Sequence, residues 1–226
     1  MGAPDAAASA AEGAAAPAVM LRAEGVSLGY GATTIVDALT VSVPRGQILA
    51  LTGENGSGKS TLLRGLAGLQ PMACAAYELA GASDSVNSAR HRRLTFAIMD
   101  HHAWLRDLTL ADHLHAVHAP GDSAMAPGEA LEVLGLGALA ARPPHALSSG
   151  QRQRAALALA CVRPWSVLFL DEPEQRLDAR YGPVVAGVLR RLVGTGSRAI
   201  VMATHAPGFR AECGAREFPM PGGGEG

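Results

Sequence analysis

The residues most able to do chemistry form a glycine-rich segment, Gly-Glu-Asn-Gly-Ser-Gly-Lys-Ser, at positions 53–60. The segment matches the pattern G-x-x-x-x-G-K-[ST], in which glycines let backbone N–H groups turn toward phosphate oxygens. We expect Lys59 to reach the β- and γ-phosphates of a nucleotide and Ser60 to hold Mg²⁺. The nucleotide-binding residues predicted here are Gly53, Glu54, Asn55, Gly56, Ser57, Gly58, Lys59, Ser60 and Thr61.

Lys59 is the only lysine in a chain with 19 lysine and arginine residues in total. Where any positive charge suffices, this sequence uses arginine. A position that keeps lysine indicates a need for a compact ammonium on a flexible stem rather than a planar fork. Codon bias with one surviving lysine is the alternative, and the position of Lys59 inside the glycine-rich segment argues against it.

A second chemical cluster follows an apolar run at residues 166–170 and consists of Asp171, Glu172 and Pro173. Two carboxylates at the end of a buried strand are typical of a Mg²⁺-linked aspartate beside a general base. A solvated acidic turn would give the same local pattern. The phosphate-binding segment elsewhere in the chain favours the catalytic interpretation.

Strands and helices alternate between these clusters, which predicts parallel pairing of strands in an α/β core. The expected strands are 33–43, 47–52, 94–99, 166–170 and 199–203. The expected helices are 59–67, 109–118, 127–141, 149–162 and 178–193.

The two ends of the chain carry little patterned apolar sequence. Residues 1–19 are predicted to be a disordered Ala-rich leader, residues 20–216 the ordered domain, and residues 217–226 a flexible tail. No stretch reaches the roughly 18 apolar residues of a membrane span, and no signal peptide is evident. The net charge of −1 gives no basic surplus for binding nucleic acid, so we expect no nucleic acid partner.

Residues 147–151, Leu-Ser-Ser-Gly-Gln, resemble the signature motif of ABC-type ATPases, usually Leu-Ser-Gly-Gly-Gln. The resemblance covers about residues 26–216, with the phosphate loop, signature, Asp-Glu pair and a histidine in family order. It implies an α/β P-loop NTPase core with a mostly parallel sheet. It also implies an antiparallel β subdomain and a short helical subdomain at about residues 101–165.

The resemblance assigns further roles to single residues. Tyr30 resembles the aromatic residue that stacks on adenine, and Asp178 lies where the family has its loop for communication across the dimer. Asp171 resembles the Mg²⁺-holding residue and Glu172 the catalytic base. His205 resembles the histidine that contacts the γ-phosphate. In the family the signature, here Ser148, Ser149, Gly150 and Gln151, completes the nucleotide site of the opposite subunit.

Two positions depart from the family pattern. Ser149 replaces the first signature glycine, and we expect a modest effect. Either Asp100 or His101, depending on a one-residue gap, stands where the family usually has a glutamine. An aspartate there could still approach Mg²⁺, so Asp100 joins Ser60 and Asp171 as a predicted metal residue.

The resemblance implies an ATP- and Mg²⁺-dependent ATPase subunit of a transporter, working as a homodimer with separately encoded transmembrane permease subunits. Such a protein is cytoplasmic and peripheral at the inner face of the membrane. Trp104 and Leu105 are expected in a groove for the permease, although a core role for Trp104 is equally open. Arg152 and Arg154 are either solvated or directed at acidic groups across the dimer.

Two other function classes remain open from the sequence. One is a soluble ABC ATPase that acts outside transport, and the other is a nucleotide sensor that hydrolyses ATP weakly. The cargo and its direction cannot be read from the sequence. No long C-terminal regulatory domain follows residue 216, which favours a minimal or exporter-like cassette.

Overall fold

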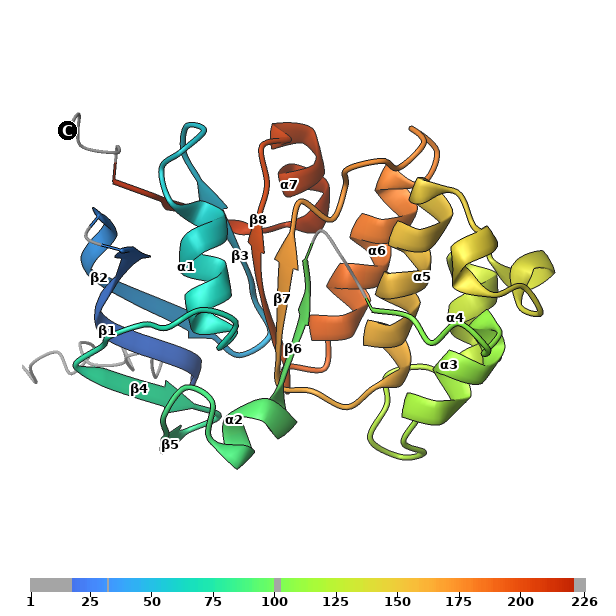
Figure 1. Ribbon diagram of the computed structural model, residues 1–226, viewed down its shortest axis with the longest axis horizontal. Coiled ribbons are helices and arrows are strands. Elements are labelled where there is room, and N and C mark those ends of the chain that lie inside the picture. Colours follow the sequence, from blue (N-terminus) through green and yellow to red (C-terminus); the bar gives the residue numbers. More distant parts are fainter. Residues whose placement is uncertain (1–17, 32, 100–102, 222–226) are drawn as a thin grey trace, which may run out of the picture.

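Two β-sheets organise the computed structural model, which describes residues 18–31, 33–99 and 103–221. In Figure 1 the antiparallel sheet lies at the left, the parallel sheet in the centre and the helical segment at the right. In the part of the chain described, no helix combines the length and apolar character needed to cross a bilayer.

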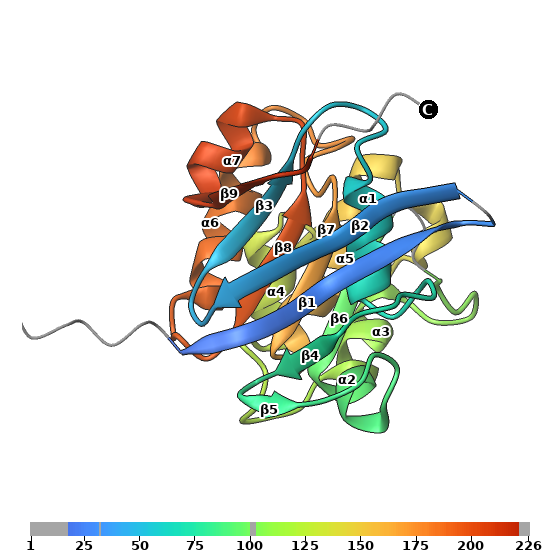
Figure 2. The ribbon, with the colours of Figure 1, turned by 90° about the vertical axis from the view of Figure 1, so that its left-hand side faces the viewer.

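The antiparallel sheet has the strand order β2-β1-β4-β5. Its two long strands, β1 (Val19–Tyr30) and β2 (Thr33–Pro44), pair with register shifts, and Figure 2 shows them crossing in front of the parallel sheet. β4 (Ala76–Leu79) and β5 (Ala82–Ser83) complete the sheet. β2 confirms the predicted strand 33–43. β1 was not predicted, because its irregular burial breaks the alternation expected of a strand, and it includes Val19 of the supposed leader.

The parallel sheet has the strand order β6-β7-β8-β3-β9, with every recorded pairing parallel. Its strands are β3 (Ile48–Thr52), β6 (Thr95–Ile98), β7 (Val167–Asp171), β8 (Ala199–Ala203) and β9 (Arg216–Pro219). The first four confirm predicted strands. Each residue of β7 and β8 is buried, as expected for strands covered on both faces.

The expectation of a flexible tail over residues 217–226 is wrong at its start. Residues 217–219 belong to β9, which pairs with β3 through Ala50 and Glu217 and through Leu51 and Phe218. The short, mixed sequence of β9 gives no strand signal of its own, because its order comes from pairing with a distant strand at the edge of the sheet.

Helices cover both faces of the parallel sheet. The helices are α1 (Lys59–Leu66), α2 (Ala89–Leu94), α3 (Leu110–Val117), α4 (Pro127–Val133), α5 (Ser149–Val162), α6 (Gly182–Val193) and α7 (Pro207–Cys213). Short 3₁₀ turns cover Gly137–Leu139 and Pro144–Ala146.

Two predicted helices are shorter than expected. The helix predicted over 127–141 ends at Val133, where Gly135 takes a left-handed φ of 63°. The helix predicted over 178–193 begins only at Gly182, because Pro183 suits a first turn and residues 178–181 form a turn instead.

The alternation of β7 places its side chains in two separate cores. Leu168 and Leu170 pack with α5 and α6, whereas Val167 and Phe169 pack with α1 and the antiparallel sheet. Because side chains alternate along a strand, Asp171 falls on the same side as Phe169. The fold therefore brings this aspartate toward the start of α1, where the phosphate-binding segment ends.

Candidate nucleotide-binding site

The loop between β3 and α1 has the backbone that a phosphate-binding loop needs. Gly53, Gly56 and Gly58 take φ values of 141°, 84° and 89°, which side-chain-bearing residues rarely adopt. A Cβ on Gly58 would lie 2.9 Å from Cγ2 of Ile35, so β2 packs closely against the loop. No side chain caps the start of α1, whose first N–H groups and dipole are thus directed at the loop.

Lys59 lies within the curve of this loop and is 5% exposed. Its Nζ donates to the carbonyl oxygens of Gly53 at 2.9 Å and Glu54 at 2.7 Å. Burial lowers the pKa of Lys59, and the negative charges of Glu172 and Asp171 oppose that shift. The loop thus holds an ammonium where phosphate oxygens would be bound by its N–H groups.

Ser60 and Asp171 are brought together from α1 and β7. The Ser60 hydroxyl donates to Oδ1 of Asp171 at 2.9 Å, and Asp171 is 7% exposed. Hydroxyl and carboxylate oxygens suit Mg²⁺, which is commonly bound by one or two carboxylates together with substrate phosphates. Among the described residues, no cluster of three or more His, Cys, Asp or Glu side chains could hold a metal ion alone. The donor set therefore fits a magnesium ion shared with a nucleotide.

Glu172 and His205 face each other across the ends of β7 and β8. Nε2 of His205 lies 3.6 Å from Oε1 of Glu172, and the side chains are 42% and 24% exposed, respectively. The Glu172 N–H donates to the carbonyl of Ala203 at 2.9 Å. Glu172 has a φ of 45°, an unusual conformation for this residue type that is typical of functional sites.

These groups line one pocket of about 370 Å³, at the carboxyl ends of the parallel strands where α/β proteins bind ligands. It is lined by Ile35, Asn55, Gly56, Gly58, Lys59, Ser60, Thr61, Glu172 and His205. An ammonium, a hydroxyl, a carboxylate and an imidazole thus converge in a space suited to phosphates. The carboxylate could orient a water molecule for attack on a phosphoryl group.

The signature residues occupy a different place, at the start of α5. Ser148 is the N-cap: its hydroxyl accepts from the Gln151 N–H at 3.2 Å, while Gln151 Oε1 accepts from the Ser148 N–H at 2.9 Å. Ser148 and Ser149 are exposed, and no signature residue lines the phosphate pocket. A Cβ on Gly150 would lie 2.4 Å from the carbonyl oxygen of Arg176, so a glycine is required there.

The predicted site residues Tyr30 and Asp178 do not line the pocket. Tyr30 is 54% exposed at the end of β1 and is not among the pocket's lining residues. The Asp178 side chain is 74% exposed, with Arg180 at 4.0 Å. Asp100, like the alternative His101, lies outside the described residues. Their roles stay predictions.

Sequence reasoning missed Ile35, which reaches the pocket from the antiparallel sheet. It also missed the contacts that hold the turn after β7. Gln153 Nε2 donates to the carbonyl of Pro173 at 3.3 Å, and the Thr204 hydroxyl donates to Glu174. These contacts join distant parts of the chain, so no local pattern could have revealed them.

Arg152 and Arg154, left open by the sequence, both bind backbone carbonyls within the chain. Arg154 is 5% exposed, donates to the carbonyls of Leu134 and Gly135, and stacks 3.6 Å from the ring centroid of Tyr181. Arg152 donates to the carbonyl of Leu147. Arg154 therefore joins the end of α4 to α5 and the start of α6.

Trp104 has a role in packing. It is partly buried against the core around α5, and its ring meets that of His113 edge-on at 5.1 Å between centroids. Leu105 is 65% exposed beside it. Because its Nε2 accepts from the Leu105 N–H at 2.9 Å, His113 is the tautomer whose Nδ1 donates to the Thr109 carbonyl at 2.7 Å.

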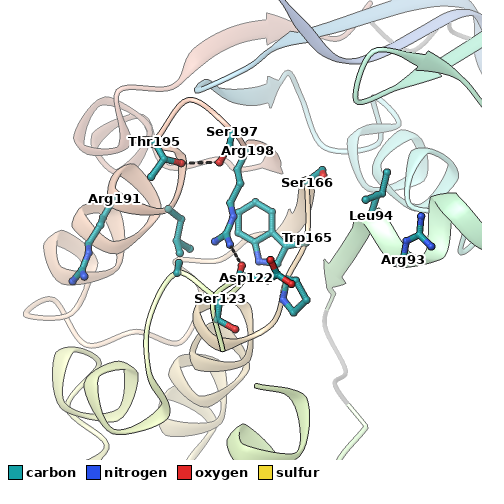
Figure 3. Close-up of a pocket in the computed structure, with 14 residues that line it drawn as sticks. Arg93, Leu94, Asp122, Ser123, Trp165, Ser166, Arg191, Thr195, Ser197 and Arg198 are labelled. Atoms are coloured by element: carbon teal, nitrogen blue, oxygen red, sulfur yellow. Dashed lines mark hydrogen bonds between the residues drawn. The ribbon is translucent and has the colours of Figure 1, made fainter. Parts of the chain in front are cut away.

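A larger cavity, of about 790 Å³, lies at the amino ends of β7 and β8, away from the phosphate loop. Figure 3 shows the Arg198 side chain beside Trp165 and directed at Asp122. Arg198 Nη2 donates to the Asp122 carbonyl at 2.7 Å, and its guanidinium lies 4.8 Å from the Trp165 ring centroid. Arg191, also in the lining, is paired with Glu129 at 2.6 Å. These contacts connect the segments next to β7 and β8 with the segment that carries α3 and α4.

Comparison with solved structures supports the fold. The ATP-binding subunit of an ABC transporter superposes with a TM-score of 0.75, at 24% identity over 84% of this chain and 81% of that one. A nucleotide-free ATP-binding cassette from an ABC transporter superposes with a TM-score of 0.74, at 18% identity over 89% of this chain and 87% of that one. The parallel and antiparallel sheets with their helices are therefore an α/β P-loop NTPase fold.

Comparison with curated sequences gives closer relatives. The sulfate/thiosulfate import ATP-binding protein CysA of Yersinia pseudotuberculosis is 38% identical over 176 residues, or 74% of this chain and 48% of that protein. The aliphatic sulfonates import ATP-binding protein SsuB 1 of Paracoccus denitrificans is 35% identical over 84% of this chain and 73% of its own length. The Fe(3+) ions import ATP-binding protein FbpC of Streptomyces coelicolor is 30% identical over 85% of this chain and 56% of its own length.

The chain spans about half the length of the CysA relative. The sequence model described as ABC transporter matches residues 36–175, which include the phosphate loop, the signature and the Asp-Glu pair. Together with the pocket lined by Lys59, Ser60 and Glu172, this match shows that the chain belongs to the ABC transporter family of ATP-binding proteins.

Proposed function

We propose that this chain binds Mg-ATP and hydrolyses it to ADP and phosphate, powering transport through separately encoded membrane subunits. The observation that carries the proposal is the convergence of Lys59, the Ser60–Asp171 pair and the Glu172–His205 pair around one pocket. Each group matches one requirement of phosphoryl transfer: charge neutralisation, metal binding and orientation of the attacking water.

In this proposal the loop at residues 53–60 binds the phosphates through its N–H groups, and Lys59 exchanges its carbonyl partners for phosphate oxygens. Ser60 and Asp171 would hold Mg²⁺, which would supply neutralisation of charge on the phosphates. Glu172 orients and polarises the attacking water. His205, whose Nε2 lies 3.6 Å from Oε1 of Glu172, contacts the γ-phosphate in this proposal.

The exposed start of α5 supports a second part of the proposal. The first turn of α5 carries the partial positive charge of a helix N-terminus, and Ser148 caps it. No residue of this turn lines the chain's own phosphate pocket. We infer that two copies pair so that Ser148, Ser149, Gly150 and Gln151 of one complete the nucleotide site of the other. Asp178 would lie at that interface, and Tyr30 would stack on adenine.

The names of the relatives support a membrane partner and a direction of transport for this proposal. All three named relatives are import proteins, which favours import and, of the minimal or exporter-like cassette suggested by the sequence, the minimal alternative. Their names give three different cargoes, so none is assigned here. The exposed Leu105, beside Trp104, is a candidate contact for a permease, and a chain that works through one would lie at the inner face of the membrane.

The test is steady-state ATP hydrolysis by the purified chain, with Glu172→Gln as the matched variant that keeps the shape of the side chain and removes its basicity. We expect turnover in the wild type and a loss on the order of 1,000-fold in the variant, since a general base typically contributes 10²–10⁴. Equal rates in the two proteins would show that Glu172 is not the catalytic base. Tight ATP binding without turnover in the wild type would favour a nucleotide sensor.

A further inference from the structure

Glu174, two residues after Glu172, is directed at the end of the neighbouring strand β8. The hydroxyl of Thr204 donates to Oε1 of Glu174 and also accepts from the N–H of Ala206 at 3.1 Å. Thr204 is 1% exposed. The two residues that flank His205 are thus both anchored through one buried hydroxyl, and that hydroxyl is held by Glu174.

The turn that carries Glu172 needs such anchoring. Glu172 has a φ of 45°, a strained conformation that persists only where the surroundings fix it. The Glu172 N–H is bound to Ala203 at 2.9 Å, and the Gln175 N–H to the Glu172 carbonyl at 3.0 Å. Glu174 adds a side-chain link from this turn to the residue that precedes His205.

We propose that Glu174 is a positioning residue for ATP hydrolysis, which through the Thr204 hydroxyl fixes the separation between the Glu172 carboxylate and the His205 ring. The inference rests on the proposed function of the same site. It adds a residue that touches neither nucleotide nor metal and that acts through the geometry of the two residues that do.

Packing alone does not account for a glutamate at this position. Its Oε2 is buried and has no hydrogen-bond partner among the described residues. Burying a carboxylate with one oxygen unpaired costs more than burying an apolar side chain of similar length. The hydrogen bond that Glu174 accepts from Thr204 is the contact that explains why a glutamate stands here despite this cost.

The first test compares kcat and KM for ATP in single variants. Thr204→Val keeps the shape and removes the hydroxyl, and Glu174→Met keeps the length and removes the acceptor. We expect kcat to fall about tenfold, since small misplacements of reacting groups cost up to about 100-fold, with KM changed less than about twofold. Thr204→Ser and Glu174→Gln, which restore a hydroxyl and an acceptor, should keep most of the wild-type kcat.

The double variant Thr204→Val with Glu174→Met separates positioning from stability. With both partners removed, neither side chain of the pair is left without the other, and only the Ala206 N–H loses its acceptor. The Tm should therefore return part of the way toward the wild-type value while kcat stays low. Recovery of kcat together with Tm, or a wild-type kcat in Thr204→Val, would overturn the inference. Neither result would affect the proposed function, which depends on the difference between wild type and Glu172→Gln.

Discussion

At the scale of single residues, the site depends on how a few charges are arranged. Lys59 is held by two carbonyl oxygens of its own loop and lies in the field of Asp171 and Glu172. The compact ammonium fits this curve because it has three donors on a flexible stem, whereas the arginine used everywhere else in the chain presents a planar fork. The retention of one lysine is therefore explained by geometry as well as charge.

Replacing Lys59 by Ala or Arg should weaken Mg-ATP binding or turnover on the order of 100-fold, the usual loss when a donor to developing phosphate charge is removed. Isothermal titration and a phosphate-release assay measure the two quantities. Arg22→Ala removes the same charge from an exposed ion pair on β1 and serves as the control. Unchanged kinetics in both Lys59 variants would contradict the phosphate-loop assignment.

At the scale of elements, the start of α5 is packed against the turn after β7. Gly150 lies against the carbonyl of Arg176, whose φ of 64° is itself unusual, and Gln153 binds Pro173. Helix α5 and the segment leading to Asp178 are therefore in direct contact within a chain. In the proposed dimer, a displacement of α5 would act on the turn that carries Glu172.

Gly150→Ala should displace the Arg176 backbone, because its Cβ would lie 2.4 Å from that carbonyl oxygen. We expect turnover to fall about tenfold or more through misplacement of the turn, with ATP affinity of the isolated chain little changed. Ser149→Gly, at the exposed neighbouring position, is the matched control and should behave as wild type. A Gly150→Ala protein with normal turnover would show that the close contact carries no function.

Arg154 supports the same helix from its other side. Arg154→Ala should lower the free energy of unfolding by about 2–3 kcal/mol, because two carbonyls lose a charged donor and Tyr181 loses its stacking partner. Arg154→Lys keeps the charge and loses the planar fork, so its free energy of unfolding should lie between those of the wild type and Arg154→Ala. Urea denaturation measures both, and a change below about 0.5 kcal/mol, as at ordinary surface positions, would contradict this role.

At the scale of the whole molecule, sequence patterns located most of the parallel sheet and the chemistry at its edge. The apolar run before Asp171 and the glycines before Lys59 are local signals, and the helix over residues 149–162 was predicted at both ends. β1, β4, β5, β9, α2 and α7 were not predicted, since they are irregular or short and are ordered by contacts with distant segments. Ile35 lines the pocket and Glu174 binds Thr204 through such long-range contacts, which no spacing encodes.

For the molecule as a whole, we predict a dimer that forms only when nucleotide is bound. Glu172→Gln with ATP and Mg²⁺ should elute from a size-exclusion column as a dimer, because ATP bridges the loop of one copy and the signature of the other without being hydrolysed. Omitting ATP, or adding Ser148→Ala and so removing the cap of α5, should return the monomer. A monomer at saturating ATP, with binding confirmed, would count against the composite site.

The central claim is that the loop before α1 clasps the phosphates of Mg-ATP, and a crystal structure of Glu172→Gln with Mg-ATP tests it most directly. The account predicts the β- and γ-phosphates on the N–H groups of residues 53–60, Lys59 bound to them, and Mg²⁺ between Ser60 and Asp171. Electron density that places the triphosphate away from this loop, or the metal away from both of these oxygen donors, would contradict it.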